Sequence, residues 1–264
     1  MNLIEKLKKT PIRKFDFDYD WYARNKKNGY RQVRLVSVDR NSVRYDEKLI
    51  DCSRAGLLNL NYYRDSESGK MVGNSGKYSA KKKSLAFSST VSLRLSLVDD
   101  LRKIDYALRP FRLRLFLLSG YRSEIAQKKA IAQISSQKRA ANAKPVSELF
   151  SNPEIYSPHQ TGGAIDAEIW DVKHNRMLKT KLADRERIEL FYLENRRCLS
   201  LEETEVKENR RLLHNLLASE EILGKNHFIH HPSEYWHYGR NERLASFFAG
   251  SLNHPVYYDI LHID

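Results

Sequence analysis

The sequence predicts an α+β fold, because helical and strand patterns occur in turn along one chain. Between residues 91 and 110, leucine and isoleucine recur every three or four positions, which is typical of an amphipathic helix that ends near Pro110. Residues 112–119 and 164–170 instead alternate apolar and other side chains, as half-buried strands do. With 264 residues, of which 41% are hydrophobic, the chain is long enough for one large domain or two small ones.

Residues 1–44 are rich in charged and aromatic side chains, and we expect them to form an extension that packs on the body of the protein. Within this extension the run FDFDYDWY, residues 15–22, alternates and favours a short strand. Residues 45–264 form the predicted body. Inside it, residues 66–84 are rich in Ser, Gly and Lys, which is typical of a mobile surface loop.

The middle of the chain predicts a second helix and a second strand. Residues 123–141 are rich in Ala, Gln and Lys and favour the helix, whereas residues 142–156 are expected to be irregular. Two glycines precede the strand at 164–170, and its alternation places Asp166 on the side opposite the apolar stripe.

The C-terminal part of the chain predicts a long helix followed by the last core strand. The charged run over residues 179–217 favours the helix, and Gly224 is expected to end it. The last strand lies within residues 228–231 or 235–238, or both segments form a hairpin.

Most of the positive charge lies in the N-terminal third. Residues 1–90 contain 20 Lys and Arg against 10 Asp and Glu, which accounts for +10 of the formal net charge of +13. Such a segment could contact nucleic acid, an anionic membrane or a wall polymer. The basic residues come in short scattered groups, however, and no RNA-binding or helix-turn-helix pattern is present, so an ordinary solvated surface is favoured and nucleic acid is not an expected partner.

Cysteine usage and the N-terminus exclude further classes. Cys52 and Cys198 have no Cys or His around them at zinc-ribbon spacing, so we expect two buried free thiols. The first residues contain no apolar core of a signal peptide, and nowhere are there about 18 consecutive apolar residues. The sequence therefore predicts a cytoplasmic protein without a membrane span.

Two short segments carry residues suited to hydrolysis. The segment 157–166, SPHQTGGAID, contains His159 and Asp166, and the segment EYWH contains Glu234 and His237. Two imidazoles and one carboxylate can bind a zinc ion and leave a fourth position for water, whose pKa zinc lowers from about 15.7 to about 7. Glu234, as a carboxylate that does not bind the metal, could take the proton of that water and pass it to the leaving amine.

The spacing of these residues demands particular local structures. On one helix, His159 and Asp166 would lie two turns apart, so the glycines between them must form a loop that returns His159 to the start of the strand. Glu234 and His237 would lie on opposite faces of an ideal strand, so we expect a turn or bulge at Glu234. Arg122 follows a predicted strand end, where it could donate hydrogen bonds to a developing oxyanion.

Structural readings of the same residues stay open. A single histidine beside glycines is commonly structural, and the segment around His237 could be a core strand with a hydrogen-bonded histidine. Arg122 could equally be a surface residue. Three further histidines close to this strand could also bind a metal: His227, His230 and His231.

Taken together, the order of the motifs resembles a known family. Gly120-Tyr-Arg122, then S-x-H-x-x-G-x-A-x-D over residues 157–166, then E-x-x-H over residues 234–237 is similar to the zinc D-alanyl-D-alanine dipeptidases of the vancomycin-resistance type, which are related to D,D-carboxypeptidases. The likeness begins near Leu49 and covers most of the chain, so residues 1–44 lie outside it. Tyr235 departs from it, because that family usually has Trp at this position.

The resemblance implies the role of each site residue. His159, Asp166 and His237 would bind Zn²⁺, and Glu234 would be the general base. Arg122 would stabilise the tetrahedral intermediate, and Ser157 would line the substrate pocket. The family fold would be a small central antiparallel-rich sheet that is flanked by helices and carries the zinc site, and residues 45–264 would form the catalytic domain.

The implied activity is zinc-dependent hydrolysis of a small dipeptide, with D-Ala-D-Ala as the first choice. A cell-wall D,D- or L,D-carboxypeptidase or endopeptidase with the same metal site stays open, since related enzymes share the motifs. A binding protein without activity, whose basic first 90 residues contact a polyanion, is the second alternative. Mn²⁺ or Fe²⁺ could replace zinc at two histidines and one aspartate. The oligomeric state is not predicted.

Overall fold

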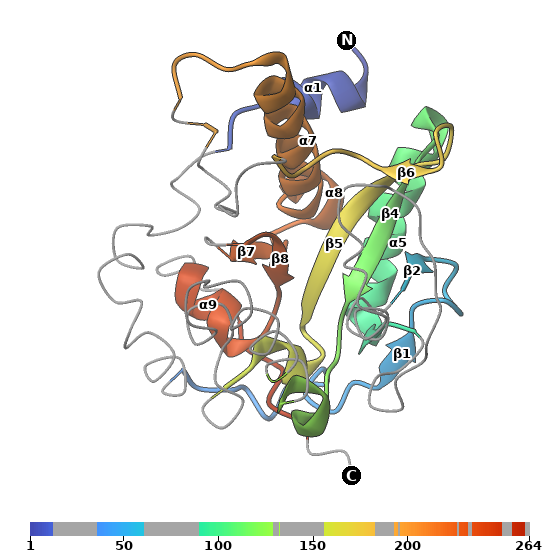
Figure 1. Ribbon diagram of the computed structural model, residues 1–264. Coiled ribbons are helices and arrows are strands. Elements are labelled where there is room, and N and C mark those ends of the chain that lie inside the picture. The colour runs from blue at the N-terminus through green and yellow to red at the C-terminus, as the bar shows by residue number, and fades with distance from the viewer. Residues whose placement is uncertain are drawn as a thin grey trace.

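The protein has an α+β fold in which helices flank a central sheet, as the sequence predicts (Figure 1). The computed structural model describes residues 1–12, 36–60, 90–128, 132, 156–182, 193–194, 196–225, 227–231, 234–249 and 255–261, without the side chains of 247–249. The predicted strand at 15–22, the predicted loop at 66–84 and nearly all of the irregular segment 142–156 lie outside these residues, as does most of the predicted helix at 123–141.

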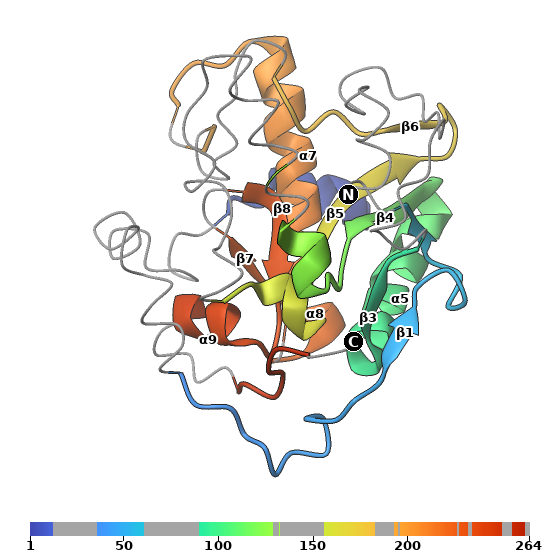
Figure 2. The same ribbon diagram turned by 60° about the horizontal axis from the view of Figure 1, so that its bottom comes forward.

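The larger sheet is mixed but mainly antiparallel. Its strands follow the order β2-β4-β5-β8-β7, with β6 paired to β5, and among these pairs only β2 and β4 run parallel. The strands are β2 (Leu58–Asn59), β4 (Leu113–Ser119), β5 (Ala164–Asp171), β6 (Arg176–Met177), β7 (Ile229–His231) and β8 (Glu234–Gly239). A separate antiparallel pair, β1 (Leu49–Asp51) and β3 (Ser92–Arg94), lies beside α5 (Leu95–Leu108) (Figure 2).

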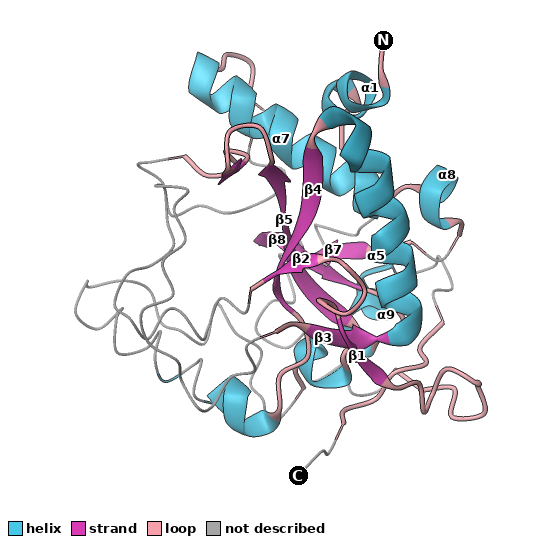
Figure 3. Ribbon diagram, turned by 90° about the vertical axis from the view of Figure 1, so that its right-hand side faces the viewer, coloured by secondary structure: helices cyan, strands magenta, loops and turns pink. Residues whose placement is uncertain are grey.

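The predicted leucine stripe forms α5, which packs along one face of the sheet (Figure 3). Its side chains Leu97, Leu101 and Ile104 are fully buried. The helix begins at Leu95, four residues later than the pattern starts, because Ser92–Arg94 pair with β1. The 3₁₀ turn η3 (Arg109–Phe111) then leads into β4.

The long C-terminal helix is shorter than predicted. It is α7 (Leu201–Leu217), whereas residues 178–180, directly after β6, have no regular secondary structure. The start is set by Ser200, whose side chain accepts a hydrogen bond from the Glu203 backbone N–H while its own backbone N–H donates to the Glu203 carboxylate. The helix ends at Leu217, and a short second helix, α8 (Glu220–Leu223), intervenes before Gly224, so Gly224 ends α8 and not the long helix.

Side chains alternate along β5, so its apolar residues and its carboxylates lie on opposite faces of the sheet. Ile165, Ala167 and Ile169 face the apolar core, together with leucines of α5 and α7. Asp166 and Glu168 therefore point to the opposite face of the sheet, as predicted for Asp166. The two strand segments predicted at the C-terminal end form a hairpin of β7 and β8, followed by α9 (Arg243–Ala249).

The first residues of the chain contact the body. Helix α1 (Leu3–Lys9) lies beside α7 (Figure 1), and the Asn215 side chain donates hydrogen bonds to the backbone oxygens of Leu7, at 2.8 Å, and Thr10, at 2.9 Å. The division of the chain at residue 44 stays a prediction.

Both cysteines are free thiols, as predicted, but Cys198 is exposed and not buried. The prediction of burial was wrong for Cys198, which lies in the segment just before α7. None of the helices within the described residues has the length and apolar character that a membrane span requires.

A buried histidine pair predicts acid sensitivity. His214 of α7 contacts His230 of β7, with 4.8 Å between ring centroids, and burial lowers the pKa of His214 to about 3, with His227 adding to the effect. Between about pH 6.5 and 3 the unfolded imidazole binds a proton that the folded one does not, so the free energy of unfolding should fall as the pH falls. One such group contributes at most about 1.4 kcal/mol per pH unit. Urea unfolding between pH 7 and 4 measures this slope, and an equal slope for His214→Gln would contradict the assignment.

Candidate metal centre

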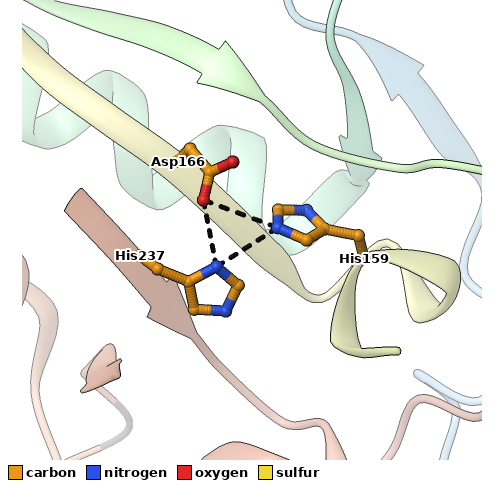
Figure 4. A group of neighbouring side chains, drawn as sticks. All are labelled: His159, Asp166 and His237. Atoms are coloured by element: carbon orange, nitrogen blue, oxygen red, sulfur yellow. Dashed lines mark hydrogen bonds and ion pairs between the residues drawn. The ribbon is translucent and has the colours of Figure 1, made fainter. Parts of the chain in front are cut away.

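Three predicted ligands from separate elements converge on the sheet face opposite α5 (Figure 4). His159 lies on the 3₁₀ turn η5 (Pro158–Thr161), Asp166 on β5 and His237 on β8. His237 Nδ1 lies 3.0 Å from Asp166 Oδ1 and 3.2 Å from His159 Nε2, and His159 Nε2 lies 3.5 Å from Asp166 Oδ1. One donor atom of each residue lies within 4.8 Å of the other two, so the three could hold one metal ion.

The glycine-containing loop brings His159 to the start of β5. Gly162 ends η5 with φ of 72°, a left-handed conformation in which glycine is strongly preferred. Arg94 holds the loop from β3, since its Nε donates to the Thr161 backbone oxygen at 2.9 Å and its backbone N–H donates to Gly162 at 3.2 Å. The loop predicted from the spacing of His159 and Asp166 is therefore present.

Strand pairing brings in the other two residues. Asp166 of β5 and His237 of β8 are direct partners in the antiparallel register. The register of β7 and β8 shifts between His230 and His231, and His231 pairs with Glu234. This irregularity lies where the spacing predicts one, and it leaves Glu234 Oε2 3.8 Å from His237 Nδ1.

Neighbouring groups set the protonation of the ligands. The Gly120 backbone oxygen lies 2.8 Å from His159 Nδ1 and accepts a hydrogen bond from its N–H, which leaves the Nε2 lone pair facing the other two candidate ligands. Burial lowers the pKa of His159 to about 4, and the positive charge of Arg122 acts in the same direction. His159 is therefore neutral near pH 7, as a metal ligand must be.

The carboxylate at the centre is stabilised as an anion. Burial alone would raise the pKa of Asp166, but His159, His237 and Arg122 together hold it well below its usual range. Burial opposes the charged form of His237, yet Asp166 and then Glu234 raise the pKa of that imidazole above its ordinary value. A metal cation would compete with that proton for His237 Nδ1.

Arg122 lies at the candidate centre, and it contacts the carboxylate oxygen of Asp166 that faces away from the two histidines. The side chain is buried, and its Nη2 donates to Asp166 Oδ2 at 2.8 Å. Its Nε donates to Ser119 Oγ at 2.9 Å and its Nη1 to Gln127 Oε1 at 3.0 Å. The surface reading of Arg122 is therefore wrong, and this arginine orients Asp166.

Ser157 lies directly before η5 and is fully buried. Its hydroxyl has no hydrogen-bond partner among the described residues, so it could meet a bound molecule, and its substrate role stays a prediction. Of the three further histidines, His230 packs on His214 across the core side of the sheet, and His231 has its ring 5.5 Å from that of His237. None of the three, His227 included, joins the candidate metal-binding group that the described residues form.

A second buried polar group lies farther along the same strands, and of its members only Tyr235 is part of the motifs. We call it the Tyr235 cluster: Glu168, Thr180, Arg210 and Tyr235. Burial raises the pKa of Glu168 to about 7, although hydrogen bonds from Tyr235 and Thr180 favour its ionised form. The strand alternation that places Asp166 on this face also applies to Glu168, and this is the signal that could have found it.

The donor set fits a zinc ion better than a hard cation. Two imidazole nitrogens and one carboxylate oxygen are typical of catalytic zinc sites, whereas Mg²⁺ and Ca²⁺ prefer oxygen ligands throughout. The groups around the three residues also fit, since His159 donates to the Gly120 carbonyl and Asp166 accepts from Arg122.

Comparison with known proteins supports the resemblance of the motifs. Residues 90–195 match the VanY family model, which is described as D-alanyl-D-alanine carboxypeptidase. The matched segment contains Arg122, Ser157, His159 and Asp166, whereas Glu234 and His237 follow it. No curated protein matches the chain.

Proposed function

We propose that the chain is a zinc-dependent peptidase that hydrolyses the bond between two D-alanine residues, since residues 90–195 match the family model described as D-alanyl-D-alanine carboxypeptidase. The convergence of His159, Asp166 and His237 carries this proposal. In it, these three residues hold Zn²⁺ on the sheet. When bound, zinc acts as a Lewis acid and lowers the pKa of a water molecule to about 7.

Glu234 is the proposed general base. Its carboxylate lies beside the metal ligands, 3.8 Å from His237 Nδ1, and its side chain is 18% exposed. It can therefore accept a proton from the attacking water and deliver it to the leaving amine, while the peptide carbonyl oxygen gains negative charge. Ser157, fully buried beside η5, is the proposed contact for the substrate.

Arg122 is proposed to act mainly through Asp166. We expect Arg122→Lys to weaken zinc binding roughly 10- to 100-fold, because lysine cannot contact Asp166, Ser119 and Gln127 together. Competition with a chelator measures the zinc affinity, and kcat is compared at saturating zinc. Unchanged affinity with a lower kcat would instead show that Arg122 acts on the oxyanion.

The same site could accept two kinds of substrate. The family description favours a longer peptide that ends in D-Ala-D-Ala, whereas the dipeptidase resemblance favours free D-Ala-D-Ala. Both contain the same scissile bond, so the difference lies in the space beyond the first D-alanine. A cytoplasmic location, which is part of the proposal, agrees better with the free dipeptide.

One purified sample tests the proposal. Bound metal is measured by elemental analysis, and hydrolysis is assayed with free D-Ala-D-Ala, with a wall pentapeptide that ends in D-Ala-D-Ala, and with L,D- and L,L-dipeptides. We expect one zinc per chain and cleavage of D,D-bonds. A zinc-loaded protein that cleaves none of these peptides, or an active protein without metal, would overturn the proposal.

A further inference from the structure

The Tyr235 cluster lies on the sheet face that carries the metal ligands. Glu168 follows Asp166 by two positions on β5, and Tyr235 precedes His237 by two positions on β8. Since strand side chains alternate, each of these residues shares a face with the ligand beside it. The cluster therefore adjoins the candidate metal centre without contributing a ligand.

Every polar group of the cluster converges on the hydroxyl or ring of Tyr235. The Tyr235 hydroxyl donates to Glu168 Oε1 at 2.9 Å and lies 2.9 Å from the Thr180 hydroxyl. Thr180 in turn donates to Glu168, with 2.9 and 3.0 Å to its two oxygens. The Arg210 guanidinium carbon lies 4.4 Å from the centre of the Tyr235 ring, and Arg210 Nε donates to the Thr180 backbone oxygen at 2.8 Å.

Three parts of the chain contribute side chains that contact Tyr235. Glu168 comes from β5, Thr180 from the segment after β6 and Arg210 from α7, and all four side chains are at most 6% exposed. Burying a carboxyl group and a guanidinium group lowers the stability of the fold unless both are hydrogen-bonded. Their hydrogen bonds therefore keep the four side chains in one well-defined arrangement. The position of the Tyr235 side chain, and with it the adjacent backbone, is therefore strongly constrained.

Glu234 needs such a constraint. It is the first residue of β8, its pairing partner His231 follows a register shift, and its side chain is the most exposed of the site carboxylates. Backbone pairing holds the end of a strand less firmly than its middle. The next residue of β8 is Tyr235, whose side-chain position the Tyr235 cluster constrains.

We propose that Tyr235, anchored by Glu168, Thr180 and Arg210, is a positioning residue that holds the Glu234 carboxylate in reach of the metal centre. This inference rests on the proposed function, in which Glu234 is the general base. It assigns to the cluster a role in kcat beyond its contribution to the stability of the fold.

The chain offers a closely matched control. Tyr258 is also fully buried, its hydroxyl donates to Glu47 Oε2 at 2.8 Å and lies 2.7 Å from the Ser96 hydroxyl, and the Arg94 guanidinium carbon lies 5.0 Å from its ring centre. Tyr258 does not adjoin Glu234. Tyr258→Phe thus removes the same kind of hydrogen bond but keeps the ring beside Arg94, so the bonds from Arg94 to the His159 loop are retained.

The test compares Tyr235→Phe with Tyr258→Phe in the full chain loaded with zinc. We expect Tyr235→Phe to lower kcat roughly 10- to 100-fold, with KM and the zinc-to-protein ratio little changed, because small misplacements of a catalytic group have effects of this size. Tyr258→Phe should lower the midpoint of thermal unfolding by a similar amount but leave kcat within about twofold of wild type. Glu168→Gln, which keeps an oxygen acceptor for Tyr235, should retain most of kcat, whereas Glu168→Leu should behave like Tyr235→Phe.

Crystal structures of the zinc-loaded wild type and Tyr235→Phe give a readout that is independent of activity. We expect the separation of the Glu234 carboxylate and His237 Nδ1 to increase in the variant. Equal kcat values for the two tyrosine variants, or an unmoved Glu234, would overturn the positioning role. If the zinc-loaded wild type cleaves no peptide, the proposed function fails, but the crystallographic separation still decides whether Tyr235 positions Glu234.

Discussion

Replacement of Glu234 by glutamine is expected to lower kcat by about 10²- to 10⁴-fold, because glutamine cannot accept a proton from water at neutral pH. The size of glutamine matches that of glutamate, so the substrate should still bind. Since Glu234 is not one of the three converging donors, the zinc-to-protein ratio should stay unchanged. Steady-state kinetics with D-Ala-D-Ala peptides and elemental analysis of the same sample provide the two measurements.

The control for this prediction is Glu205→Gln, which changes an exposed glutamate of α7 in the same way and should leave kcat unaltered. Two outcomes would remove Glu234 from its proposed role. The first is a kcat within a few-fold of wild type. The second is loss of zinc from Glu234→Gln, which would make this residue a ligand instead of a base.

Replacement of His237 by alanine should abolish stable zinc binding and activity together. It removes one of three donors, so the loss of zinc affinity should exceed the roughly 10- to 100-fold change that is typical of an outer-shell residue. The fold should persist, because Asp166 keeps its ion pair with Arg122 at 2.8 Å. Zinc retention after a chelator challenge, activity and the circular dichroism spectrum are measured on one sample.

Asp166→Ala is predicted to lower the free energy of unfolding more than His237→Ala does. It removes the same number of ligands but leaves the buried Arg122 without its carboxylate, and an uncompensated buried charge typically costs about 3–5 kcal/mol. Asp166→Ala should therefore unfold at a lower denaturant concentration than His237→Ala. His174→Ala is the control, since His174 is exposed and its Nδ1 lies 2.6 Å from Asp171 Oδ2, and this variant should retain zinc. Full zinc retention in His237→Ala would exclude this residue as a ligand.

Local patterns predicted the elements that build the sheet. The leucine spacing identified α5, and alternation identified β4 and β5, because burial on one face imposes the period of the element on its apolar residues. The long C-terminal helix was misjudged at its start. A run of charged, helix-favouring residues does not show where a helix begins, whereas the reciprocal hydrogen bonds of Ser200 and Glu203 do.

The motifs also predicted which residues meet at the candidate centre. The glycine loop had to return His159 to β5, and the spacing of Glu234 and His237 required an irregular strand, and both features are present. The sequence did not indicate which nitrogen of each histidine faces the centre. That depends on the Gly120 backbone oxygen beside His159 and on the pairing of His237 with Asp166.

By itself, the sequence determined the α+β class, the identity and order of the candidate ligands, and the likeness to D-alanyl-D-alanine peptidases, because these depend on residue types and short spacings. The tertiary structure alone decided that Arg122 holds Asp166, across 44 positions of the chain, and that Tyr235 bonds to Glu168, across 67 positions. Neither contact leaves a local pattern. Each arises from strand register and from the burial of charged groups, which need partners wherever the fold can bring them.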